Sequence, residues 1–426
     1  MFIPYGKIRQ SIFATVLLVV SVSTVRASEF DAIRISTNIQ QFHMPYGTLL
    51  DPVFASSDPA SPGYSQIVSY TRAGDSAIWT GHYLAAEAFR YRATRSPEAF
   101  ENVWRALRGI RSLLDITGTD LLARCLIPTT SPYAANIQRE EGGHGIYYNK
   151  LGGVDYFWIG NTSRDQYSGV MFGLSAAYDL VEDQSVRDFI RADVTRILNY
   201  LLLHGWNVIM PDGSISTTFR IRWDQQLSFL QVGRRINPQK FESTYFSYRS
   251  AYASLVSVPT AYDNVDDHNH YFKFNLNYIN LYDLIRLEED TSEYRQIYMR
   301  AYDGLRRRTQ QHGNAHFNMV DRTLKGANSA RDAETATLLQ LWLKRPRRDY
   351  RIDLRSKYPA CRQEDRACDP IPVDERVNTD FLWQRSPFLL YGGGLGTVET
   401  AAIDYILPYW MARSFGLSGL FAQESR

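Results

Sequence analysis

The sequence predicts a mainly α-helical protein built from repeated helical hairpins, and three observations support this. First, residues 73–95 (AGDSAIWTGHYLAAEAFRYRATR) and 161–183 (NTSRDQYSGVMFGLSAAYDLVED) follow one pattern: an acid, an aromatic–hydroxyl–glycine triplet, then an apolar segment rich in small residues. Second, each is followed by a segment with the periodicity of an amphipathic helix. Third, residues 268–313 repeat the plan. A hairpin that cannot bury its inner face alone is stabilised by neighbouring copies.

The first helix of each hairpin is expected at 76–92, 164–181 and 268–290. These segments are apolar nearly all round, which indicates buried inner helices. Weaker candidates for further inner helices are residues 332–345 and 398–417.

The second helix of each hairpin is expected at 96–118, 183–205 and 291–313. In the first of these, Ser96 is a helix-capping residue and Gly118 a helix-ending one. The charged residues lie on the opposite face, which predicts an outer position. The apolar face of the first of these helices carries Phe100, Val103, Trp104, Leu107, Ile110 and Leu114.

Long segments connect the hairpins, at 119–160, 206–262 and 346–395. Connections of this length in a compact domain are usually functional, and short strands fit within them. The glycine-rich residues 391–396 (YGGGLG) are expected to form a close-packed turn before the last inner helix. No linker divides the chain, so the sequence predicts a single domain over residues 28–426.

Residues 1–27 are expected to form a signal peptide. Lys7 and Arg9 make a positive start, residues 12–22 form an apolar stretch too short to span a bilayer comfortably, and residues 25–27 resemble a cleavage site. The sequence therefore predicts export to the periplasm or the extracellular space, with no stable membrane insertion after cleavage.

Removing residues 1–27 changes the formal net charge from +2 to −1, because it removes three basic residues and no acid. A near-neutral chain does not predict nucleic-acid binding. In an oxidising compartment Cys361 and Cys368 are expected to form a small disulfide, leaving Cys125 as a buried thiol. The chain has no Walker loop, HExxH or GxSxG motif, and we expect no cofactor.

The repeats at 73–117, 161–205 and 268–313, with the tail at 398–417, resemble the (α/α) toroid, or six-hairpin glycosidase-like, superfamily. That superfamily covers secreted glycoside hydrolases and, in a related incomplete form, many polysaccharide lyases. The resemblance implies an oligosaccharide or polysaccharide substrate and a cleft where the loops entering the inner helices converge. No motif selects one family within the superfamily, so no catalytic residue is carried over from it.

Several candidate site residues lie at the starts of the first two inner helices. Asp75 and Asp165 each lie within about a turn of a helix start, where backbone N–H groups favour a carboxylate. They are therefore candidate catalytic residues or simple helix caps. Arg164 is a candidate for substrate binding, as are the aromatic residues Trp79 and Tyr167 of the two triplets. An aromatic surplus suits a sugar-binding groove and equally suits a helical core.

The densest polar cluster precedes the third inner helix, within DNVDDHNHYFKFN at 263–275. Three hypotheses compete for it. Asp266, His268 and Tyr271 are candidates for acid–base catalysis on a sugar, with His270 binding substrate. The cluster also contains good ligands for zinc or calcium, although its spacing matches no metal motif. The third hypothesis is a capped helix start.

A second polar loop, REEGGHGIYYNKLGGVDYFWIGN at 139–161, places acids beside aromatic rings. Glu141 is a candidate catalytic residue, and His144, Tyr148 and Trp158 are candidates for substrate binding. The same composition describes a β-hairpin that packs on the mouth of a helical barrel. The paired glycines between Glu141 and His144 argue against a regular helix, so these two are not expected to form a helical pair.

Taken together, the sequence favours an exported glycoside hydrolase that uses two carboxyl groups on one bond. The expected pair is Asp75 or Asp165 with Asp266 or Glu141.

Two alternatives remain from the sequence alone. A uronate-polysaccharide lyase would use His268 or Tyr271 as the base, with Arg164 or Asn269 neutralising the substrate carboxylate. A non-catalytic glycan-binding toroid would use the same aromatics, with the carboxylates only capping helices.

Overall fold

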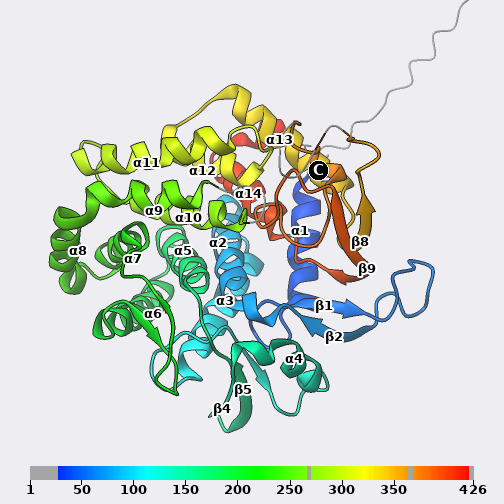
Figure 1. Ribbon diagram of the computed structural model, residues 1–426, viewed down its shortest axis with the longest axis horizontal. Coiled ribbons are helices and arrows are strands. Elements are labelled where there is room, and N and C mark those ends of the chain that lie inside the picture. The colour runs from blue at the N-terminus through cyan, green and yellow to red at the C-terminus, as the bar shows by residue number, and fades with distance from the viewer. Residues whose placement is uncertain (1–26, 266–269, 360, 362–367, 422–426) are drawn as a thin grey trace, which may run out of the picture.

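The chain is mainly helical in its computed structural model (Figure 1). The structure describes residues 27–265, 270–359, 361 and 368–421, so the predicted signal peptide lies outside it apart from Ala27. The α-helices of these ranges are α1 (Glu29–Asn38), α2 (Ser76–Thr94), α3 (Pro97–Asp115), α4 (Ala134–Glu141), α5 (Arg164–Leu180), α6 (Gln184–Leu203), α7 (Trp223–Ile236), α8 (Pro238–Tyr252), α9 (Ser257–Asp263), α10 (Phe272–Arg286), α11 (Glu293–Thr309), α12 (Ala315–Lys325), α13 (Ser329–Lys344) and α14 (Ile403–Ser414).

The predicted helix pairs are confirmed as α2 with α3, α5 with α6, and α10 with α11. Side-chain caps fix where the outer helices begin. The Ser96 hydroxyl accepts a hydrogen bond from the Ala99 N–H at 3.4 Å, and the Asp183 carboxylate accepts one from the Val186 N–H at 2.9 Å. The cap residues are local in sequence, which is why these boundaries follow from the sequence.

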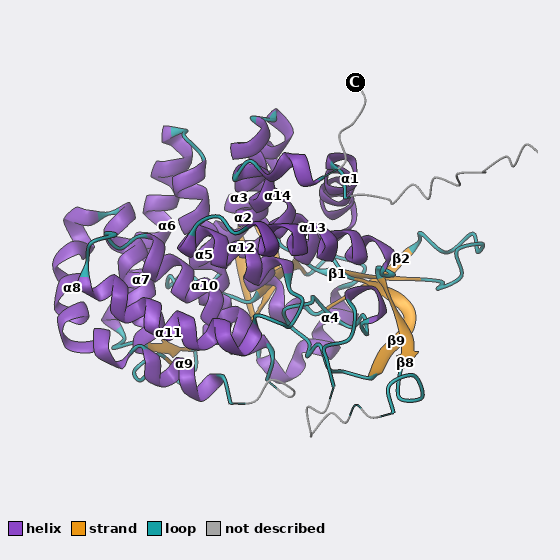
Figure 2. Cartoon of the chain, turned by 90° about the horizontal axis from the view of Figure 1, so that it is seen from above, coloured by secondary structure: helices purple, strands orange, loops and turns teal. Residues whose placement is uncertain are grey.

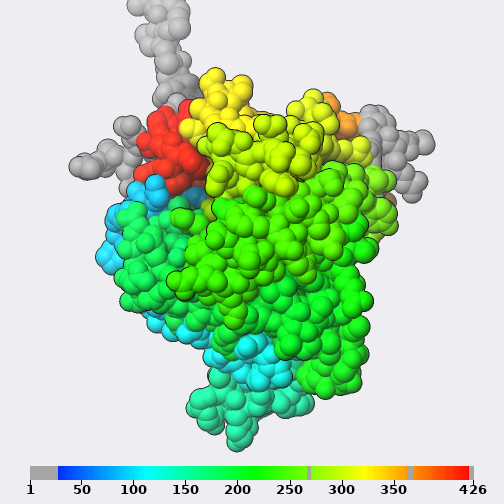
Figure 3. Space-filling model, turned by 90° about the vertical axis from the view of Figure 1, so that its left-hand side faces the viewer, coloured from blue at the N-terminus to red at the C-terminus, as the bar shows by residue number. Residues whose placement is uncertain are grey.

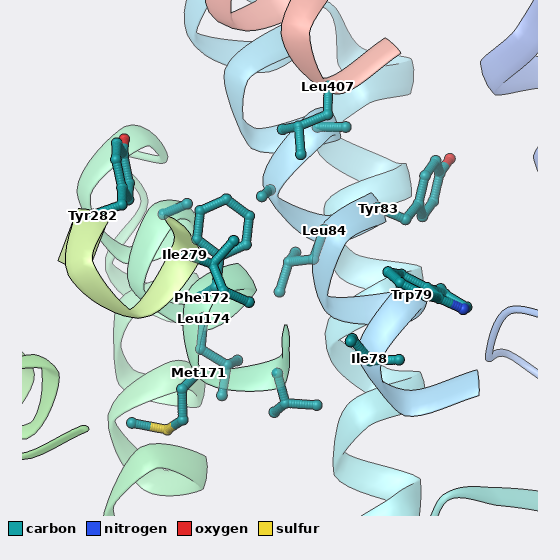
Figure 4. Close-up of a cluster of buried hydrophobic side chains, with 14 of the residues drawn as sticks. Ile78, Trp79, Tyr83, Leu84, Met171, Phe172, Leu174, Ile279, Tyr282 and Leu407 are labelled. Atoms are coloured by element: carbon teal, nitrogen blue, oxygen red, sulfur yellow. The ribbon is translucent and has the colours of Figure 1, made fainter. Parts of the chain in front are cut away.

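The repeated triplet places a glycine where α2 and α5 cross. A Cβ on Gly169 would lie 2.6 Å from the Ile78 carbonyl oxygen, and one on Gly173 would lie 2.8 Å from the Gly81 Cα. Only a residue without a side chain allows two helix backbones to approach this closely. Figure 4 shows the apolar side chains of the two helices, including Leu84, facing one another beside this crossing.

The inner helices pack against one another in succession. Helix α2 packs against α5 and α14, α14 against α12, α12 against α10, and α10 against both α7 and α5. The second helices pack on their partners, α3 on α2, α8 on α7, α11 on α10 and α13 on α12. Figure 2 shows these helices grouped on one side, with the largest sheet on the other. One large apolar cluster joins the inner helices into a common core.

The prediction of a long loop at 206–262 is wrong, because α7, α8 and α9 occupy most of it. The buried face of α7 carries Gln225, Gln226 and Gln231. Buried amides interrupt the apolar periodicity from which a core helix is predicted.

The expected inner position of residues 332–345 is also corrected. Helix α12, at Ala315–Lys325, is the element between α10 and α14, and α13 packs chiefly against α12. Buried polar residues again interrupt the apolar periodicity that would predict this helix. In α12 these are His316, Asn318 and Asp321.

The strands form three small sheets in the described ranges, ordered β2-β1-β9-β8, β3-β5-β4 and β6-β7. In Figure 3 the hairpin of β4 and β5 protrudes at the lower end of the molecule. The strands are β1 (Asp51–Phe54), β2 (Ile67–Thr71), β3 (Cys125–Pro128), β4 (Ile146–Leu151), β5 (Val154–Ile159), β6 (Asn207–Ile209), β7 (Ile215–Thr218), β8 (Arg348–Asp353) and β9 (Tyr391–Glu399).

Residues 391–396, expected as a turn, begin strand β9 and pair with β8. Gly393 has φ +96°, and a Cβ there would lie 2.8 Å from the Arg351 Cα. The glycines therefore allow an irregular strand pairing in which Tyr350 faces both Gly394 and Leu395.

The predicted disulfide between Cys361 and Cys368 is present, and Cys125 is a buried free thiol. In the portion of the chain that the structure covers, none of the helices combines the length and apolar character needed to cross a bilayer.

Candidate functional site

Asp75 lies at the entrance to α2, where a short 3-10 turn, Ala73–Asp75, leads into the helix. It is the N-cap residue by position, yet its side chain makes no capping hydrogen bond. About a third of the side chain, 35%, is exposed, so the carboxyl group is reachable from solvent. The capping hypothesis therefore does not account for this aspartate.

A polar network connects Asp75 to the start of α5. The Gln166 side-chain amide donates to Asp75 Oδ1 at 3.2 Å, and its carbonyl oxygen accepts from the Ile78 N–H at 3.0 Å. Arg124 Nη1 lies 3.8 Å from Asp75 Oδ1. The same guanidinium donates through Nη2 to Ser163 Oγ at 2.8 Å, and Ser163 donates to Asp165. The two sequence-predicted aspartates thus share one network.

The environment favours the protonated form of Asp75. The pKa of Asp75 is raised to about 7, first by burial and then by the negative charges of Asp165 and Asp380, against the opposing effects of Arg124 and Gln166. A carboxyl group that holds its proton near neutral pH can donate it to a substrate.

Asp380 is a third acid beside this network. Its side chain is buried, its backbone neighbour Phe381 donates an N–H to it at 2.9 Å, and Arg385 lies 3.7 Å away. Burial raises the pKa of Asp380, opposed first by Arg72. The negative charge of Asp380 raises the pKa of Asp75, although the two residues are more than three hundred positions apart in sequence.

A cavity of about 270 Å³ opens beside Asp165. Asp165 and Arg164 line it together with the buried ion-pair group of Arg222 and Asp263. Arg222 donates to both oxygens of Asp224, at 3.1 and 2.6 Å, and to Asp263 at 2.5 Å. These contacts satisfy the Arg222 charge inside the protein.

A second cavity, of about 460 Å³, shares four lining residues with the first and continues it. The shared residues are Arg164, Arg222, Asp263 and Lys273. Its remaining wall is mainly apolar, formed by Thr218, Ile221, Trp223, Val258, Pro259 and Tyr262. We call the two cavities together the Arg164 groove.

Glu141 and His144 form a close pair across the end of α4, although they do not share one regular α-helix. Glu141 ends α4, and Gly142–His144 continue as a 3-10 turn that brings His144 Nδ1 to 2.6 Å from Glu141 Oε2. The paired glycines end the α-helix without ending the helical turn. Glu141 also accepts from the Gly74 N–H at 2.8 Å, so it supports the turn that presents Asp75.

Three of the predicted substrate-binding aromatics are buried packing residues in the structure. Tyr167 is fully buried, and its hydroxyl accepts a hydrogen bond from the Leu122 N–H at 3.2 Å. Trp158 stacks on the Tyr147 ring, and Trp79 packs against Phe381. These contacts explain the three rings without a ligand.

Tyr148, in contrast, is 67% exposed, and it lines a separate cavity on the hairpin of β4 and β5. Of the candidate residues in the polar cluster before α10, Asp266 and His268 lie outside the described residues, and His270 is exposed. Tyr271 is buried, with its hydroxyl 3.3 Å from His312 Nδ1.

Sequence reasoning missed Arg124, Gln166 and Asp380, which complete the surroundings of Asp75. Each is a single polar residue with no motif around it, and each approaches Asp75 through tertiary structure. For Gln166 a signal was present, because it directly follows Asp165 in the repeated segment.

Among the described residues, no three or more His, Cys, Asp or Glu side chains are grouped so that they could hold a metal ion. No protein-family model, curated protein sequence or solved structure matches this chain.

Proposed function

We propose that the protein is an exported glycoside hydrolase in which Asp75 is the general acid and Asp165 supplies the second carboxyl group. The observation that carries the proposal is the coupling of these two acids at adjoining helix starts, with the pKa of Asp75 raised to about 7. Glycoside hydrolysis commonly uses two carboxyl groups in different protonation states, flanking one bond.

In this mechanism Asp75 protonates the oxygen of the leaving sugar as the glycosidic bond breaks. Asp165, in its carboxylate form, either activates a water molecule or attacks the sugar directly. Gln166 holds Asp75 through a 3.2 Å hydrogen bond, and Ser163 donates to Asp165. Because both supports come from the α5 entrance, one turn of chain sets the position of both acids.

We further propose that the six inner helices α2, α5, α7, α10, α12 and α14 close into an (α/α) toroid. Their succession of contacts, which returns from α14 to α2, supports this. So does the placement of Asp75 and Asp165 at the starts of adjacent inner helices. The predicted signal peptide at residues 1–27 supports export, and the expected substrate is an oligosaccharide or polysaccharide.

The test is an incubation of the mature chain with neutral and uronate-containing polysaccharides, following reducing ends and ultraviolet absorbance together. Hydrolysis releases reducing ends without a new chromophore. Asp75→Asn is expected to lower kcat by about 10²–10⁴-fold. A matched control is Asp290→Asn, because the Asp290 side chain is 94% exposed and lies outside the network.

A substrate with a nitrophenyl leaving group separates the acid role from a structural one. Such a group departs without protonation, so Asp75→Asn should lose far less activity on it than on a polysaccharide. Equal losses on both substrates would contradict the assignment of Asp75 as the acid. An unsaturated, ultraviolet-absorbing product would indicate a lyase instead, and binding without any release would indicate a glycan-binding protein.

A further inference from the structure

The position of the Arg164 cation is not explained by its contribution to protein stability. It is the first residue of α5, where the positive end of the helix dipole disfavours a basic side chain. Its guanidinium donates only through Nη1, to Thr217 Oγ1 at 3.4 Å and to the Thr218 carbonyl oxygen at 3.1 Å. Within the described ranges, no carboxylate lies at ion-pair distance from it.

The other cations of the Arg164 groove are already neutralised by acids. Arg222 is held between Asp224 and Asp263, and Lys273 Nζ lies 3.8 Å from Asp263 Oδ1. Burial, followed by repulsion from Arg222, lowers the pKa of Arg164, and the attraction of Asp263, Asp165 and Asp224 offsets this only in part. An anionic ligand at this place would supply the missing partner.

The location of Arg164 connects this charge to the proposed reaction. It neighbours Asp165 in sequence, and both line the cavity of about 270 Å³. Successive residues of a helix point about 100° apart, which separates the guanidinium from the carboxyl group. A sugar that reaches Asp165 would therefore present a substituent to Arg164.

The second part of the groove offers an apolar wall beyond this charge. Ile221, Val258 and Tyr262 are 69%, 54% and 76% exposed, although they are apolar or aromatic residues. Trp223 lies in the same wall and stacks on Tyr252. Aromatic faces pack against the C–H faces of sugar rings, so the wall suits the next unit of a chain.

We propose that Arg164 binds the carboxylate of a uronic acid unit, and that the wall of Trp223 and Tyr262 carries the adjacent sugar. A guanidinium fork matches a planar carboxylate, and Nε and Nη2 of Arg164 make no hydrogen bond within the described structure. The assignment of the carboxylate to a substrate sugar rests on the proposed function, whereas the anion site itself does not.

The experiment measures binding without turnover, by calorimetric titration of the mature Asp75→Asn protein. The probes are tetrasaccharides of galacturonate, of alginate and of hyaluronan, each compared with its carboxyl methyl ester. We expect at least one acid probe to bind, and its ester to bind about 10- to 100-fold more weakly. Adding Arg164→Gln should weaken the acid probe by a similar factor and leave the ester unchanged.

Control variants separate a specific contact from general charge or misfolding. Arg220→Gln removes an exposed cation from the β7–α7 connection, outside both cavities, and should leave binding unchanged. Arg164→Lys keeps the charge and should recover part of the affinity. Unchanged thermal unfolding of the Arg164 variants would show that the loss comes from the contact.

Several outcomes would overturn the inference. These are the absence of binding to all three acid probes, binding that esterification does not weaken, and equal losses from Arg220→Gln and Arg164→Gln. A sulfated neutral oligosaccharide that binds through Arg164 in place of the uronates would reassign the site to sulfate. Uronate binding through Arg164 with no hydrolysis by the wild-type chain would support this inference and contradict the proposed function. Hydrolysis of neutral glycans alone, with KM unchanged by Arg164→Gln, would support the proposed function and contradict this inference.

Discussion

Replacing Gly169 with alanine should strain the crossing of α2 and α5, around which the site is arranged. The new Cβ would lie 2.6 Å from the Ile78 carbonyl oxygen and 2.7 Å from the Ile78 Cα. Both are backbone atoms of a helix and cannot rotate away, so the helices must separate by several tenths of an ångström. Overpacking of this kind costs about 3 kcal/mol or more, and the better helix propensity of alanine returns about 1 kcal/mol.

The net loss of about 2 kcal/mol is measurable by thermal unfolding. For a chain of this length the unfolding entropy is roughly 0.9 kcal/mol per kelvin, so Tm should fall by about 2 °C or more. The matched control is Gly304→Ala in α11, where a Cβ meets no atom within 4 Å. That change should raise the free energy of unfolding by about 0.5–1 kcal/mol. If both variants shift Tm upward, the close crossing of α2 and α5 is not what requires Gly169.

Three further predictions follow from the site and its surroundings. Because Asp75 must hold its proton to act as the acid, and its pKa is raised to about 7, kcat/KM should fall as the pH rises through about 7; Asp75→Asn should remove this limb of the profile. Burial lowers the pKa of His82 to about 4, so as the pH falls the unfolded chain takes up this proton before the folded protein does. The free energy of unfolding should therefore fall by about 3 kcal/mol between about pH 6.5 and pH 4. Urea titrations measure this slope, and His82→Gln should make it shallower. Arg222→Met leaves Asp224 and Asp263 buried without their partner, and should lower the free energy of unfolding by about 3–5 kcal/mol in the same titrations, whereas a change under 1 kcal/mol would contradict the buried ion-pair description.

The sequence predicted the helices whose signals are local. Ser96 and Asp183 cap their helices through hydrogen bonds to residues three positions on, so the boundaries of α3 and α6 could be placed by inspection. Helices α7 and α12 escaped because their buried faces carry polar side chains such as Gln225 and His316. A periodicity argument reads such residues as exposed.

For the candidate site, too, local features could be predicted from the sequence and tertiary contacts could not. Asp75 and Asp165 were predicted because each occupies a defined place in a repeated segment. Their relationship to each other was not, because it depends on Gln166 crossing from α5 to α2 and on Arg124 reaching both helix starts. Trp79 and Tyr167 were expected at the ligand because the sequence does not distinguish an aromatic ring that faces a groove from one that faces the core.

The buried surroundings of Trp79 nevertheless bear on the chemistry of Asp75. Asp75, Trp79 and His82 are spaced four and three residues apart, which places them on one face of α2. Trp79 packs on Phe381 and lies 6.3 Å from Trp383, and His82 lies 5.3 Å from Trp383, measured between ring centroids.

The turns of α2 that follow Asp75 therefore carry Trp79, packed among aromatic rings, and His82, whose pKa is lowered by burial. Burial is the first cause of the raised pKa of Asp75, and the negative charges of Asp165 and Asp380 follow. We propose that Trp79, which the sequence assigned to sugar binding, contributes to the burial of Asp75 from the next turn of α2. Mutating Trp79 to a small polar residue would consequently be expected to lower the pKa of Asp75 and shift the alkaline limb of kcat/KM to lower pH.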